Sequence, residues 1–135
     1  MLSLPLRLQP GDDVRGAVVA ALLASGHQAG FVLQGIGSLS VAQLRYAGQP
    51  HATALHGDLE ILTLSGSIAP DGAHLHMSVS DARGQVLGGH VAPGCVVRTT
   101  AELLLALLPE RRFTREFDPL TGYPELKISP DRPRR

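Results

Sequence analysis

The feature that most constrains the fold of this chain is an alternating segment followed by a tight turn. Residues 74–80 alternate polar with apolar side chains, so His74 and His76 leave a strand on the same face. The turn follows at Asp81–Gly84, where Gly84 suits the left-handed position that closes a three-residue hairpin loop. The segment therefore predicts a β-hairpin with two histidines on one face of its first strand.

The register of this hairpin decides whether a third histidine joins them. If Asp81 pairs with Gln85, His76 lies directly opposite His90, and His74 lies one same-face step away. Opposed residues have Cβ atoms roughly 4.5–5.5 Å apart. Imidazoles that close can share one metal ion at about 2.0–2.1 Å per Zn–N bond. The alternative is that the three histidines lie at a surface or an interface and only form hydrogen bonds.

A shorter turn would separate the histidines. A two-residue loop at Arg83 and Gly84 would place His90 opposite Met77, because a one-residue slip sends every side chain to the other face. The prediction of a metal site thus depends on the three-residue loop.

Length and composition fit one ordinary domain. The chain has 135 residues, 44% hydrophobic and 4% aromatic, so its core must be mainly aliphatic. Lys plus Arg and Asp plus Glu each number 12, and this neutral balance lacks the basic footprint of a DNA-binding surface. The single cysteine, Cys95, excludes an intrachain disulfide. No signal peptide or apolar membrane span is visible, so we expect a cytoplasmic protein with no membrane partner.

Local signals predict several strands and one clear helix. Leu2–Leu8 is expected as an edge strand because it contains Pro5. A helix is expected from Val14 to Ser25, after an Asp12-Asp13 cap and before Gly26. Further strands are expected across 29–40, which residues 41–46 either extend or return, and across 55–67, 113–117 and 126–128, whereas 95–108 fits either a strand or a helix.

These elements define the expected fold class and boundaries. Many strands with one or two helices predict an α+β domain with a mostly antiparallel sheet. We expect this single domain to cover residues 1–128, and residues 129–135 to form a disordered basic tail rich in Pro and Arg.

Glu60 is a candidate functional carboxylate because it interrupts an apolar strand. A buried carboxylate costs several kcal/mol unless it is paired, so we expect Glu60 to pair with Arg45 or Arg98. The alternative is a general base beside a metal-bound water. Arg98 and Glu102 are four residues apart and share a face, which predicts a second charge pair.

Several short strings, taken together and in order, resemble the PPC domain, the plants and prokaryotes conserved domain also called DUF296. They cover about residues 4 to 127 and include Arg7-Leu8-Gln9-Pro10-Gly11-Asp12, Gly35-Ile36-Gly37-Ser38-Leu39, Gly57-Asp58-Leu59-Glu60-Ile61-Leu62, His74-Leu75-His76, Gly88-Gly89-His90, Arg98-Thr99-Thr100-Ala101-Glu102 and Thr121-Gly122-Tyr123-Pro124-Glu125-Leu126.

The resemblance implies an antiparallel sheet with flanking helices, packed as a homotrimer. It also implies a metal site, since some prokaryotic members hold a metal through histidines at the positions of His74, His76 and His90. Plant members carry an AT-hook before the domain. Nothing of that kind precedes residue 4 here, so we expect the stand-alone prokaryotic type, whose biochemical role is not established.

Two classes of function follow. The first is a non-enzymatic homotrimer that binds zinc or another divalent transition metal, and with it a small ligand or a protein; DNA binding enters only by analogy with the plant proteins and is unsupported by net charge. The second is a small metal-dependent hydrolase or lyase, in which a three-histidine site leaves one position open for water. Glu60, His56 or Glu102 would then carry the proton.

Overall fold

The computed structural model describes residues 1–132, so residues 133–135 of the expected tail lie outside the described part. Its elements, in chain order, are β1 (Leu2–Leu8), α1 (Val14–Ser25), β2 (Gly30–Arg45), β3 (Thr53–Ala69), β4 (Gly72–Ser80), β5 (Val86–Val91), β6 (Val96–Leu107), β7 (Arg111–Asp118) and β8 (Tyr123–Pro130). The expected α+β class is confirmed, with a single helix among the described residues.

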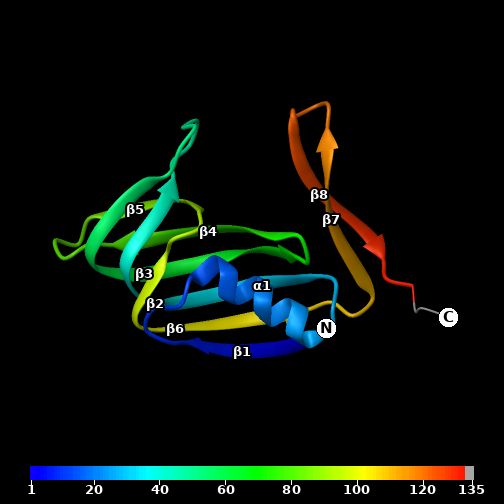
Figure 1. Ribbon diagram of the computed structural model, residues 1–135, viewed down its shortest axis with the longest axis horizontal. Coiled ribbons are helices and arrows are strands. Elements are labelled where there is room, and N and C mark those ends of the chain that lie inside the picture. The colour runs from blue at the N-terminus through cyan, green and yellow to red at the C-terminus, as the bar shows by residue number, and fades with distance from the viewer. Residues whose placement is uncertain (133–135) are drawn as a thin grey trace.

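The main sheet is antiparallel and closes partly on itself. Its strand order is β1-β6-β2-β3-β4-β5, and the end of β2 also pairs with β5. The long strands β2 and β3 bend, with register shifts in their pairing, so that β5 at the far edge returns to β2. Helix α1 lies across one face of the sheet (Figure 1). The expected edge strand is confirmed, because β1, which contains Pro5, pairs only with β6 within residues 1–132.

Helix α1 begins and ends where the capping residues predict. The Asp13 carboxylate accepts hydrogen bonds from the backbone N–H of Gly16 at 2.7 Å and of Gly94 at 2.6 Å. At the other end Gly26 adopts the left-handed conformation, with φ of 75°. Val14, Val18 and Leu22 of the helix are fully buried against the sheet. The apolar spacing of the sequence thus fixes the face that α1 turns to the core.

Residues 96–107 form strand β6 rather than a helix. Ala101–Leu108 has high helix propensity, but β6 pairs with β1 on one side and β2 on the other. Leu103 and Leu105 are buried, while Leu104 between them is 40% exposed. This alternation belongs to a strand, and two neighbouring strands outweigh the local propensity.

Strands β7 and β8 form a separate hairpin that stands off from one end of the main sheet (Figure 1). Phe113 anchors its base, in a small buried cluster with Ala29 and Ala69. Strand β8 continues through Ser129 and Pro130, two residues beyond the expected domain boundary at 128.

The helix content also bears on membrane insertion. Within residues 1–132, no helix is both long and apolar enough to span a bilayer, since the single helix there has 12 residues.

Candidate metal centre

The hairpin of β4 and β5 has the predicted three-residue loop. Asp81 and Gln85 pair across it, the Asp81 N–H donating to the Gln85 carbonyl at 3.0 Å. Gly84 closes the turn with φ of 77°. The register then places His76 opposite His90, as the count of residues predicts.

Glycine at position 89 allows the backbones of β5 and β2 to approach closely beside His90. The Gly89 position lies so near the end of β2 that a Cβ there would come within 2.7 Å of the Arg45 carbonyl oxygen. Glycine therefore lets β5 pass between β4 and the end of β2. Arg45 pairs with His90 across this contact. The Gly-Gly-His sequence thus brings a third strand, with its arginine, up to the histidines.

The three imidazoles form one cluster on one face of the β4–β5 hairpin. The ring centroids of His76 and His90 are 4.4 Å apart, and the ring centroid of His74 lies 5.0 Å from that of His76 and 5.3 Å from that of His90. One ring nitrogen from each residue lies within 4.8 Å of the other two. His76 Nε2 and His90 Nδ1 are 3.0 Å apart, within hydrogen-bond distance. His74 and His76 are exposed and His90 is half-buried, so an ion can reach the cluster from solvent.

The surroundings keep two of these imidazoles neutral. Although His74 is exposed, the partial loss of water around its ring lowers its pKa below the usual 6.5, with the positive charges of Arg115 and Arg45 adding to this effect. Burial also lowers the pKa of His90, again with a contribution from Arg45. A neutral imidazole offers the lone pair that a metal needs, so both side chains are ready to bind at pH 7.

The other candidate residues lie elsewhere. Glu60 of β3 lies opposite Ser80 of β4. Ser80 is four residues from His76 along β4, so Glu60 and His76 are separated by roughly 13 Å along the sheet at strand spacing. His56 is exposed on β3, and Glu102 is exposed on β6. The structure brings none of these three side chains into the histidine cluster, and the hydrolase alternative loses its named proton carriers.

Arg98 is the pairing partner of Glu60, but the setting differs from the expectation. Arg98 Nη2 lies 3.7 Å from Glu60 Oε1, and its Nε lies 3.6 Å from Asp58 Oδ1. Glu60 is exposed rather than buried, because it points away from the core between buried Leu59 and Ile61. The expected pair of Arg98 with Glu102 was wrong, since both partners of Arg98 come from β3, which β2 separates from β6 in the sheet.

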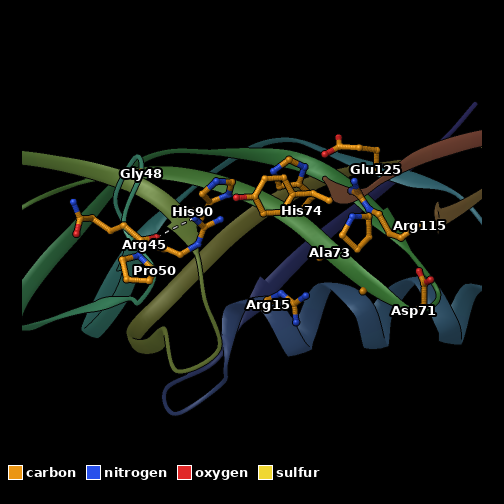
Figure 2. A pocket seen from close by; sticks show the side chains of 14 residues that line it. Arg15, Arg45, Gly48, Pro50, Asp71, Ala73, His74, His90, Arg115 and Glu125 are labelled. Atoms are coloured by element: carbon orange, nitrogen blue, oxygen red, sulfur yellow. Dashed lines mark hydrogen bonds between the residues drawn. The ribbon is translucent and has the colours of Figure 1, made fainter. Parts of the chain in front are cut away.

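Sequence reasoning missed most of the residues that surround the cluster. An open cavity beside His74 and His90 is lined by Arg15 of α1, Arg45 of β2 and, from the β7–β8 hairpin, Arg115, Tyr123 and Glu125 (Figure 2). These residues come from distant parts of the chain, and no spacing pattern links the three arginines. The string Thr121-Gly122-Tyr123-Pro124-Glu125-Leu126, which carries part of the family resemblance, was the one signal that marked Tyr123 and Glu125.

Comparisons with known proteins agree with this architecture. A family model, the Plants and Prokaryotes Conserved (PCC) domain, matches residues 2–109. A hypothetical protein from Salmonella cholerae-suis (Salmonella enterica) is 42% identical, with 96% of this chain and 94% of that chain covered and a TM-score of 0.92. A metal-containing protein from Archaeoglobus fulgidus is 28% identical, with 93% and 92% covered and a TM-score of 0.77.

Two further similarities extend the range of relatives. A structure from Ralstonia eutropha JMP134, whose name proposes DNA binding, is 26% identical, with 93% and 90% covered and a TM-score of 0.75. The bifunctional protein GlmU of Synechococcus sp. (strain JA-2-3B'a(2-13)) is 55% identical over 126 residues, which is 93% of this chain. This chain spans only 20% of the length of that curated relative.

Proposed function

This chain belongs to the Plants and Prokaryotes Conserved (PCC) domain family, and we propose that His74, His76 and His90 hold a divalent transition-metal ion in it. The observation that carries the proposal is the convergence of one ring nitrogen from each histidine within 4.8 Å. The metal-containing relative from Archaeoglobus fulgidus supports it. An all-imidazole site favours zinc, with nickel, copper and iron as the other candidates.

The cluster fits such an ion with small side-chain movements. Zn–N bonds of about 2.0–2.1 Å place the nitrogens of a tetrahedral site roughly 3.3 Å from one another. His76 Nε2 and His90 Nδ1 are 3.0 Å apart, and one ring nitrogen from each of the three histidines lies within 4.8 Å of the other two. Rotation of exposed imidazoles can adjust both values. Three protein ligands leave a fourth position for water or a ligand.

Metal analysis of tag-free protein tests the proposal. We expect the purified protein, or the protein after dialysis against zinc, to hold close to one equivalent per chain. His76→Ala should lose the metal, whereas His56→Ala, which changes an exposed histidine of β3 outside the cluster, should keep it. A wild-type protein that takes up no metal, or a His76→Ala protein with full metal content, would falsify the proposal. One equivalent per three chains would instead assign a site shared by three subunits.

We further propose that the chain assembles as a homotrimer. The sheet face turned away from α1 leaves large apolar side chains in solvent, among them Leu33 at 51%, Ile36 at 49% and Leu104 at 40% exposure. An open apolar hollow of about 650 Å³ crosses β1, β6 and β2 at this face. Apolar patches of this kind mark contact surfaces, and a second and third copy of the chain would cover it.

Light scattering tests the assembly. A trimer of 14.3 kDa chains has a mass of about 43 kDa, and a mass near 14.3 kDa in dilute buffer would refute it. Leu104→Glu should lower the mass toward that of the monomer, because it places a charge in the apolar face. Leu23→Glu, a similar change at a 56% exposed position of α1, should leave the mass unchanged.

DNA binding is the alternative that the Ralstonia neighbour's name raises. The formal net charge of zero argues against it, because phosphate contacts dominate the affinity for duplex DNA. A gel shift with duplex DNA in low salt tests this alternative. Binding that weakens steeply as salt rises would support it, and no shift even at low salt would end it.

A further inference from the structure

The cavity beside the histidine cluster is built around an incomplete strand pairing. Strand β5 pairs with β4 only from His76 to Ser80, so the first residues of β4, from Gly72 to Leu75, have no partner strand on that side in the described part of the chain. Helix α1 lies below this edge and the β7–β8 hairpin closes one end (Figure 2). The resulting space is open and measures about 710 Å³, within the range of small-molecule sites.

Three arginines face this space from three different elements. Arg15, Arg45 and Arg115 all line it, and each is half-buried. Figure 2 shows Arg45 and Arg115 on opposite sides of His74 and His90, with Arg15 below them on α1. Because the three come from α1, β2 and β7, the cavity is a product of the fold and not of one charged segment.

Within residues 1–132, none of these arginines is paired with a carboxylate. Among the described residues, the ion pairs involve other basic side chains, namely Arg98, Arg112 and Lys127. Arg115 donates to the Ser67 hydroxyl at 2.8 Å, and Arg45 donates to the Gln49 carbonyl at 3.4 Å. Each guanidinium carries five N–H donors, so most donors of both remain available to an anion.

The cavity is positive although the chain as a whole is neutral. Its lining holds three arginines and two carboxylates, Asp71 and Glu125, which leaves one positive charge. A divalent ion on neutral imidazoles would raise this to three. Arg15 also lies in the first turn of α1, where the helix dipole disfavours a positive charge, so an anion in the cavity would relieve that repulsion.

We propose that this cavity binds a small organic anion, whose carboxylate or phosphate group lies among Arg15, Arg45 and Arg115 and completes the coordination of the metal ion. The inference rests on the metal site proposed above. Guanidinium groups match carboxylate and phosphate oxygens in both charge and geometry. The volume exceeds what a bare oxyanion needs, and Tyr123, Pro50 and Pro124 supply apolar surface for the organic part.

Cobalt-loaded protein gives separate readouts for the metal and the anion. Visible absorption bands of Co²⁺ report its binding to the histidines, and a change in these bands reports entry of a new ligand. We would titrate the loaded protein with succinate, benzoate and glycerol 3-phosphate, and use succinamide as the uncharged control. At least one of the anions should change the bands with saturation in the micromolar to low-millimolar range, whereas succinamide should not.

Arginine variants assign the anion to this cavity. Arg15→Gln and Arg45→Gln should each weaken anion binding at least about tenfold, since each removes a charge-assisted hydrogen bond to the anion. Arg83→Gln removes the same charge from the exposed β4–β5 turn, outside the cavity lining, and should leave the affinity unchanged. The cobalt content of every sample is measured separately, so that each affinity refers to loaded protein.

The outcomes separate the two proposals. Cobalt bands that no anion changes at 10 mM, or an anion affinity equal in Arg45→Gln and Arg83→Gln, would overturn the anion site while the metal site stands. Absence of cobalt bands in wild-type protein would overturn the metal site and, with it, the anion site as stated here.

Discussion

Replacement of Gly66 by alanine should damage both the sheet and the histidine cluster that we propose as a metal site. Gly66 lies in β3 between Val32 of β2 and Leu75 of β4, with φ of 150°. A Cβ at this position would collide with the carbonyl oxygen of His74 and lie 2.8 Å from the Leu75 Cα. These are backbone atoms and cannot rotate away, so β4 must move, and His74 moves with it.

Two contributions set how far Gly66→Ala lowers the free energy of unfolding. A backbone conformation that non-glycine residues rarely adopt costs of order 1–3 kcal/mol. Forcing an extra methyl group into a packed region costs about 1–3 kcal/mol more. Gly57, also in β3, has φ of 123°, but an alanine methyl group there would have nothing within 4 Å, so Gly57→Ala should show the first contribution alone. The difference between the two variants, about 1–3 kcal/mol, isolates the collision with β4.

Urea unfolding of the two variants measures this difference. Both are compared at equal protein concentration, because the stability of a protein that assembles depends on its concentration. Zinc content, measured on the folded protein, gives the functional half of the prediction. We expect Gly66→Ala to lose metal and Gly57→Ala to retain it. Equal unfolding free energies, together with full metal content in Gly66→Ala, would show that β4 can yield at no cost and would refute the reasoning.

The helix cap, the histidines and the last strand give further expected outcomes. Asp13→Ala should destabilise the protein by about 1–3 kcal/mol in urea unfolding, because two backbone donors lose their acceptor, whereas Asp12→Ala, at an exposed position, should cost less than about 1 kcal/mol. Because the pKa values of His74 and His90 are lowered, the unfolded chain binds more protons below about pH 6.5, so metal-free protein should lose stability as pH falls below that value. Zinc affinity, followed by titration, should fall in the same range as protons compete for the imidazoles. A chain ending at Ile128 should melt only a few degrees lower in calorimetry, about 2–5 °C, since among the described residues it loses the last two pairs of an exposed hairpin and the contacts of Asp131 with Arg112 and Glu110.

Much of the histidine cluster could be predicted from the sequence because it is local. His74, His76 and His90 lie within 17 residues of one another in the chain, and one loop sets their register. The alternation of residues 74–80 places His74 and His76 on the same face of β4, and Gly84 determines the length of the loop between β4 and β5. The limits of α1 were predictable for the same reason, because caps act within one turn of the helix ends.

Other features depended on which strands become neighbours. The segment 96–107 has a helical propensity, and it is a strand because β1 and β2 pair with its two edges. Arg98 could pair with Glu102 on its own strand, but β3, which lies beyond β2 in the strand order, supplies Asp58 and Glu60. Local pattern leaves such choices open, since the competing contacts come from distant parts of the chain.

The histidine hairpin, the capped helix and the alternating core strands were thus encoded in local patterns of residues. The cavity that Arg15, Arg45 and Arg115 share with the histidines was not, and it exists because the folded chain brings α1, β2 and β7 together. Those arginines lie 30 and 70 residues apart along the chain, and no periodicity relates them. Periodic patterns encode the face on which a side chain lies within its own element, whereas the meeting of separate elements follows from strand order and packing of the whole core.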